Sequence, residues 1–81
     1  MKTIDIIYNN KKYELEITEK AEWNNLTQEQ KNKYEANGQY QYEGKLFYIT
    51  KSNKRLTVPS FTVEGASEEY IHQEVNNWLE N

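Results

Sequence analysis

Cysteine is absent from this chain, and histidine, proline and glycine are scarce: the 81 residues include one His, one Pro and three Gly. Without cysteine there is neither a disulfide nor a thiolate metal site, so packing alone must stabilise the fold. One histidine excludes a metal site built from several histidines, and isolated glycines exclude a glycine-rich phosphate-binding loop. The groups that most often carry catalysis are nearly absent, so we expect no enzyme activity, no cofactor and no bound metal.

Long apolar runs are missing as well. The chain begins Met1-Lys2-Thr3-Ile4-Asp5, which lacks the apolar stretch of roughly 7–15 residues that a signal peptide contains. No segment approaches the roughly 18 apolar residues of a membrane span. We therefore expect a cytoplasmic protein without membrane contact, located in the host cytoplasm if a phage encodes it.

Aromatic side chains, by contrast, are abundant: the chain holds seven Tyr, two Trp and two Phe. Together with a net charge of only −3, this content favours a folded chain over a disordered one. We expect one domain, residues 1–81, which at this length buries only about 60% of the surface of its unfolded form. So small a core cannot bury every tyrosine, because each buried hydroxyl needs a hydrogen-bond partner.

The N-terminal part of the chain has the pattern of a β-hairpin. Apolar and polar residues alternate over 3–8 and again over 12–17. The intervening Asn9-Asn10-Lys11 suits a tight turn, because Asn tolerates the left-handed backbone conformation that such turns require. The pattern predicts two antiparallel strands with one apolar face.

A short helix is predicted over residues 28–36. Thr27 and Gln30 have the spacing of a capping box, and Gly38 is a suitable C-terminal stop. Few apolar residues occur in and before this helix, so we expect it to lie on the sheet through a narrow contact. The expected anchors of that contact are Trp23 and Leu26.

The middle of the chain returns to the alternation of strands. Strand segments are predicted at 39–43, 45–50 and 55–58, with a turn at Lys51-Ser52-Asn53-Lys54 before the last one. Pro59 has no backbone N–H to donate to a neighbouring strand. It therefore ends the last segment or places it at the edge of the sheet.

Residues 67–79 have the clearest helical pattern. Ser67 is a suitable N-cap, and acidic residues in the first turn suit the positive end of the helix dipole. Apolar residues follow at helical spacing, namely Ile71, Val75, Trp78 and Leu79. We predict an α+β fold: a small antiparallel sheet of four to five strands, with a C-terminal amphipathic helix packed on one face. The predicted order is strand, strand, helix, strand, strand, strand, helix.

Tyr40, Tyr42 and Tyr48 are the first candidates for a binding surface. If 39–43 pairs with 45–50, these rings lie close together on one sheet face, and tyrosine is enriched in protein interfaces. We therefore predict a protein-binding patch there. The alternative is that the rings pack under the helices and extend the core.

Acidic residues before and within the last helix are the second candidate. Glu64, Glu68 and Glu69 can mimic phosphates and contact a basic partner protein, so they join the predicted protein-binding set. The alternative is that Glu68 and Glu69 only complement the helix dipole.

Lys51, Lys54 and Arg55 form a basic hairpin close to Tyr48 and are the candidate nucleic-acid-binding residues. The isoelectric point of about 5.1 argues against this hypothesis, because nucleic-acid-binding domains are usually basic. Lysines at turns also protect sheet edges from aggregation.

On balance we expect a non-catalytic protein-binding module. A compact chain rich in Lys, Asn, Glu and Tyr resembles the small accessory proteins of AT-rich bacteria and their phages. That resemblance implies an inhibitor of a host nuclease or defence protein, such as an anti-CRISPR-like protein. The alternatives are a small nucleic-acid-binding protein that uses the basic hairpin, and a structural subunit that self-associates through an edge strand. We expect a monomer or a weak homodimer.

Overall fold

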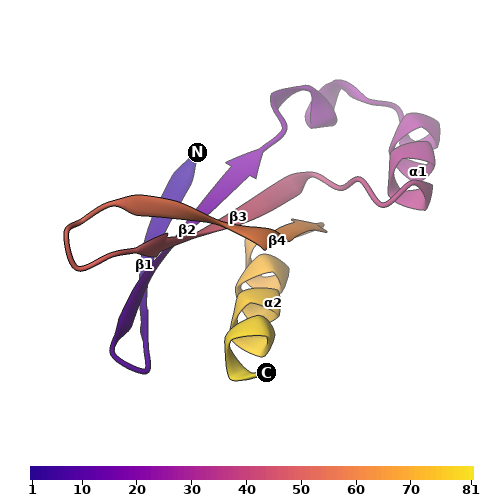
Figure 1. The fold of residues 1–81 in the computed structure, drawn as a ribbon. Helices are drawn as coiled ribbons and strands as arrows, with labels where there is room; N and C mark the ends of the chain where they lie inside the picture. Colours follow the sequence, from indigo (N-terminus) through magenta and orange to yellow (C-terminus); the bar gives the residue numbers. More distant parts are fainter.

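The computed structural model describes residues 1–58 and 61–81, and within them four strands form one antiparallel sheet in the order β1-β2-β3-β4 (Figure 1). Two helices and a 3-10 helix complete the described chain. In chain order the elements are β1 (Lys2–Tyr8), β2 (Lys11–Glu19), η1 (Ala21–Asn25), α1 (Gln28–Ala36), β3 (Tyr42–Ile49), β4 (Arg55–Gly65) and α2 (Glu68–Glu80). The predicted α+β class is confirmed.

Both predicted hairpin turns are confirmed. Asn9 and Asn10, between β1 and β2, have positive φ angles of 50° and 61°. Asn53, between β3 and β4, has a φ of 64°. Asparagine tolerates this left-handed conformation better than most residues, so the turns form where the sequence places them. Pro59, predicted to end a strand or mark a sheet edge, lies outside the described residues.

The predicted pairing of 39–43 with 45–50 is wrong, because residues 42–49 form the single strand β3. Gly44, which lies between the two predicted strand segments, is buried inside this strand opposite Ile17 and Val63. A Cβ atom at Gly44 would lie 2.5 Å from Cγ2 of Ile71 on α2. The absence of a side chain at Gly44 therefore allows α2 to approach the sheet closely.

Helix α2 packs on one face of the sheet, as predicted. The Ser67 hydroxyl accepts a hydrogen bond from the backbone N–H of Tyr70 at 3.2 Å and caps the helix. Ile71 and Val75 on its inner side are fully buried. The buried core consists of these two residues with Leu15, Ile17, Leu46 and Phe61.

Helix α1 does not lie on the sheet, so that prediction is wrong. The capping box forms as predicted: Thr27 Oγ1 accepts from the Gln30 N–H at 3.2 Å, and Gln30 Oε1 accepts from the Thr27 N–H at 2.9 Å. All nine residues of α1 are described and none is buried, since its sequence QEQKNKYEA offers no apolar stripe. Residues 20–41, here called the arm, project beyond the end of the sheet (Figure 1). The molecule is accordingly elongated, 46 × 24 × 19 Å.

Candidate functional site

The three tyrosines predicted to form one patch lie at different places. Tyr42 and Tyr48 stand at opposite ends of β3, on the same sheet face but about 20 Å apart along the strand. Tyr42 packs against the core, whereas the Tyr48 ring packs against Tyr13 with 5.6 Å between ring centres. Tyr40 precedes β3 and lines a separate pocket of about 210 Å³ beside Gly65. The structure therefore does not bring the three rings together.

Glu64 lies at the base of the arm. Its carboxylate accepts a hydrogen bond from the backbone N–H of Tyr40 at 2.9 Å and forms an ion pair with the Lys20 ammonium group. Lys20 begins the arm and its backbone N–H donates to the Gln41 carbonyl at 2.9 Å, where the arm returns. Both side chains of the ion pair are largely shielded from solvent. Glu64 therefore fixes the two ends of the arm to β4.

Glu68 and Glu69 occupy the first turn of α2, as predicted. The Glu68 carboxylate lies 3.2 Å from the Lys2 ammonium group in an exposed ion pair, and Glu69 is exposed. Together with the half-buried His72 they line a shallow depression of about 430 Å³. Glu64 is at the arm base instead, so the three predicted acidic residues divide between two places.

Arg55 lies on the sheet face opposite α2, where two glutamates of β2 hold it. Its Nε atom is 3.0 Å from Glu14 Oε1, and its Nη2 atom donates to Glu16 Oε2 at 2.7 Å. The guanidinium carbon also lies 3.6 Å from the centre of the Phe47 ring. Arg55, a predicted nucleic-acid-binding residue, is therefore already bound by side chains of its own chain.

Lys51 and Lys54, the other two predicted basic residues, are exposed in the turn between β3 and β4. The turn is closed by a hydrogen bond of 2.9 Å from the Thr50 N–H to the Lys54 carbonyl. Within residues 1–58 and 61–81, no ion pair involves either lysine. These lysines therefore differ from Arg55: they are exposed to solvent and, in the described residues, form no ion pair, whereas Arg55 is bound to two glutamates.

Tyr70 is an exposed side chain of α2 that lines the same pocket as Tyr40. The carboxylate of Glu74, one turn further along the helix, raises the pKa of the Tyr70 phenol above its ordinary value of 10.0. The main cause is repulsion between this carboxylate and the phenolate, and a hydrogen bond from the phenol to Glu74 adds to it. At neutral pH the phenol is therefore a hydrogen-bond donor.

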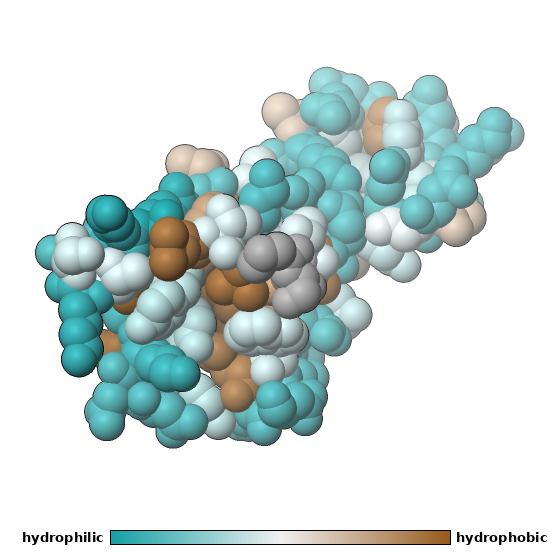
Figure 2. All heavy atoms as spheres, in the orientation of Figure 1, coloured by the Kyte–Doolittle hydropathy of each residue, from teal (hydrophilic) through white to brown (hydrophobic). Residues whose placement is uncertain are grey.

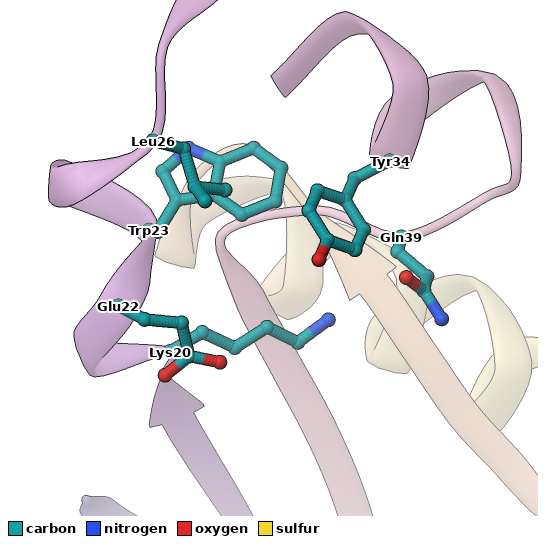
Figure 3. A pocket seen from close by; sticks show the side chains of 6 residues that line it. All are labelled: Lys20, Glu22, Trp23, Leu26, Tyr34 and Gln39. Atoms are coloured by element: carbon teal, nitrogen blue, oxygen red, sulfur yellow. The ribbon is translucent and has the colours of Figure 1, made fainter. Parts of the chain in front are cut away.

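The arm encloses its own small pocket of about 250 Å³ (Figure 3). Trp23 is only 7% exposed, and its ring centre lies 6.1 Å from that of Tyr34. In Figure 3 the Trp23 and Leu26 side chains overlap in the view, and the Tyr34 ring lies across the pocket from them. Three polar residues complete the lining, namely Lys20, Glu22 and Gln39. Trp23 and Leu26, expected to anchor a helix on the sheet, instead pack within the arm.

Tyr34 was not singled out by the sequence as a site residue. A usable signal was nevertheless present: Trp23 and Tyr34 flank a segment rich in Asn and Gln, in which no apolar stripe follows the helical period. A helix that has no apolar face cannot pack on a sheet, so its aromatic residue must pack locally or face a partner.

In the part of the chain that the structure describes, no group of three or more His, Cys, Asp or Glu residues is arranged to hold a metal ion. Within those same residues, neither helix has the length and apolar character needed to cross a membrane. Comparison with known protein families, curated proteins and solved structures gives no match to this chain.

Proposed function

We propose that this chain is a non-catalytic protein-binding module and that the arm is its recognition element. The supporting observation is that the arm adds nothing to the shared core: the core residues come from the sheet and α2. Ordering the backbone of one residue costs about 1–2 kcal/mol of conformational free energy. An ordered segment outside the core bears this cost without adding to the burial of the core. Binding residues are found disproportionately on segments that connect the elements of a rigid core.

The chemistry of the arm suits a protein surface. Tyr34 and Tyr40 supply aromatic contact area, and the surrounding amide side chains supply adaptable hydrogen bonds. The 250 Å³ pocket is smaller than the roughly 300–1,000 Å³ typical of cofactor and drug-like ligand sites. It matches one side chain of a partner better than it matches a small-molecule ligand.

The base of the arm supports the same proposal. Glu64 is bonded to Lys20 and Tyr40, which precede and follow the projecting segment. Such bonds hold the arm in one direction relative to the sheet and reduce the conformational entropy lost when a partner binds. The arm is therefore presented as a preorganised projection.

The proposed partner class rests on a resemblance. The resemblance to small accessory proteins of AT-rich bacteria and phages makes a host nuclease or another defence protein the first partner to test, with the chain as its inhibitor. In this proposal the arm enters a cleft of the target, and the chain needs no catalytic group of its own.

An armless variant tests the proposal. Because the Lys20 N–H donates to the Gln41 carbonyl, replacing residues 21–40 by Asn-Gly closes β2 and β3 with a two-residue turn. We expect the variant to remain folded, as shown by cooperative unfolding in denaturant. It should no longer capture the protein that the full chain binds in a host lysate. An armless variant that captures the same protein with the same affinity contradicts the proposal.

A pair of double variants provides the matched control. Asn24→Lys with Asn25→Lys alters exposed positions of η1, and Asn76→Lys with Asn77→Lys makes the same change on exposed positions of α2. We expect the first pair to weaken partner binding by about tenfold or more and the second to leave it unchanged. Equal effects of the two pairs would show that the arm has no special role.

A further inference from the structure

A row of apolar and aromatic side chains crosses the sheet at the end opposite the arm. Ile6 pairs with Tyr13, Tyr13 pairs with Tyr48, and Tyr48 pairs with Leu56, so the row runs through β1, β2, β3 and β4. These side chains share the face on which α2 packs. Leu56 is 49% exposed, and Trp78 in the last turns of α2 is 37% exposed. The sheet therefore leaves an apolar surface open beside the end of the helix.

A pocket of about 410 Å³ continues this surface between the first hairpin and the end of α2. Aromatic and aliphatic side chains line it, namely Tyr8, Tyr13, Trp78 and Leu79, together with the polar residues Asn9, Lys11 and Asn81. In Figure 2, hydrophobic and intermediate side chains gather between the β3–β4 hairpin and α2, with hydrophilic ones around them. The recess thus combines aromatic and aliphatic side chains, against which an apolar group can pack, with polar ones.

The charge around this surface is mainly positive. Lys11 lies in the first hairpin, and Lys51 and Lys54 lie in the turn between β3 and β4, at the same end of the sheet. In the described residues the ion pairs involve Lys2, Lys20, Lys45 and Arg55, so these three ammonium groups are free of them. Glu80, in the last turn of α2, adds an acidic residue at the end of the helix. A partner with several carboxylates would complement the surface.

From this geometry we infer a second interaction surface, which binds an acidic protein segment whose apolar side chain enters the 410 Å³ pocket. Two observations favour a protein segment over nucleic acid. The rings of Tyr13 and Tyr48 are tilted by 58° against each other, so they do not form parallel platforms for successive bases. The whole chain carries a net charge of −3, which repels a long polyanion more than a short acidic segment.

This surface is independent of the arm, because all its residues lie at the other end of the sheet. The armless variant should therefore retain it. Loss of partner capture by the arm and loss of acidic-segment binding by this surface are separate outcomes, so either proposal can fail alone.

Fluorescence anisotropy with three labelled probes tests the inference. The probes are the peptide Glu-Asp-Phe-Glu-Glu-Leu-Glu-Asp, its neutral counterpart with Gln and Asn at the acidic positions, and a thymidine oligonucleotide. We expect the acidic peptide to bind about tenfold or more tightly than the neutral one at low salt and to shift the Trp78 indole resonance. Equal affinity for the two peptides, or tighter binding of the oligonucleotide, would overturn the inference.

Matched variants assign the binding to this surface. Lys51→Glu with Lys54→Glu should weaken binding of the acidic peptide about tenfold, whereas Lys31→Glu with Lys33→Glu in α1 makes the same charge change at the far end and should have little effect. Leu56→Asn tests the apolar part of the surface and should weaken binding of the acidic peptide. Ile7→Asn, on the opposite sheet face, is its control and should leave binding unchanged. Circular dichroism confirms that each variant is folded. Unchanged binding by the Lys51 and Lys54 double variant contradicts the inference.

Discussion

Glu64 and Tyr40 are joined by a hydrogen bond of 2.9 Å from the Tyr40 backbone N–H to the Glu64 carboxylate, which also pairs with the Lys20 ammonium group. Through these contacts one side chain of β4 positions both the outgoing and the returning segment of the arm. Removing a contact that holds the arm should therefore destabilise the arm more than it destabilises the rest of the fold.

Glu64→Ala is expected to lower the free energy of unfolding by about 1–2 kcal/mol, because it leaves a shielded ammonium group and a backbone N–H without their acceptor. Amide hydrogen exchange within the arm should rise more than exchange within the sheet. Glu80→Ala, at an exposed position of α2, is the control and should change stability by less than about 0.5 kcal/mol. Uniform exchange throughout the chain would argue against a role of Glu64 in positioning the arm.

Gly44→Ala is expected to destabilise the fold by about 1–3 kcal/mol, because its Cβ would lie 2.5 Å from Ile71 Cγ2 and 3.2 Å from Val63 Cγ1. The Cγ methyl groups of these β-branched side chains cannot turn away without a change of rotamer. Ile71→Ala removes the nearest atom, so the double variant should lose less stability than the sum of the single variants. Denaturant unfolding of all four chains measures this coupling, and strict additivity would contradict the proposed close approach.

Arg55→Lys is expected to lower stability by about 1 kcal/mol although it keeps the charge. The lysine cannot reach Glu14 and Glu16 in the same forked geometry, and it loses the flat contact with Phe47. Since the Arg55 side chain is 43% exposed, added salt should reduce the difference between the two chains. Urea unfolding at low and high salt measures both effects; an unchanged midpoint would show that these contacts contribute nothing.

Tyr70 provides a pH-dependent prediction. Glu74 raises the pKa of the Tyr70 phenol in the folded chain, so the folded state holds this proton more tightly than the unfolded state. Its contribution to stability is therefore present below the ordinary pKa of 10.0 and is lost as pH rises through the folded-state pKa. Glu74→Gln should lower the phenol pKa towards 10.0, as measured by NMR titration of labelled tyrosine; an unchanged pKa would rule out Glu74 as the cause.

The first hairpin and the last helix could be predicted because their signals are local. Alternation over a few residues defines β1 and β2, and two asparagines supply the left-handed turn between them. Ser67 caps α2 through a bond to a residue three positions away. Such features depend on neighbours in the sequence, so a single chain is enough to find them.

The position of α1 and the continuity of β3 could not be predicted in the same way. The capping box at Thr27 marks where α1 begins, but it carries no information on what the helix packs against. Gly44 suits a turn as well as it suits a close contact, and only the approach of Ile71 from a distant part of the chain distinguishes the two. The wrong predictions both concern contacts between residues far apart in sequence.

The candidate site shows the same division. The sequence alone determined which residues are charged or aromatic, where the first hairpin and the two α-helices lie, and that Lys51 and Lys54 lie in a turn. Only the tertiary structure decided that Glu64 is bound to the arm, that Arg55 is held by two glutamates, and that Tyr13, Tyr48 and Leu56 form one row. The physical reason is that strand register and helix docking determine which distant side chains meet, and these depend on how the whole core packs.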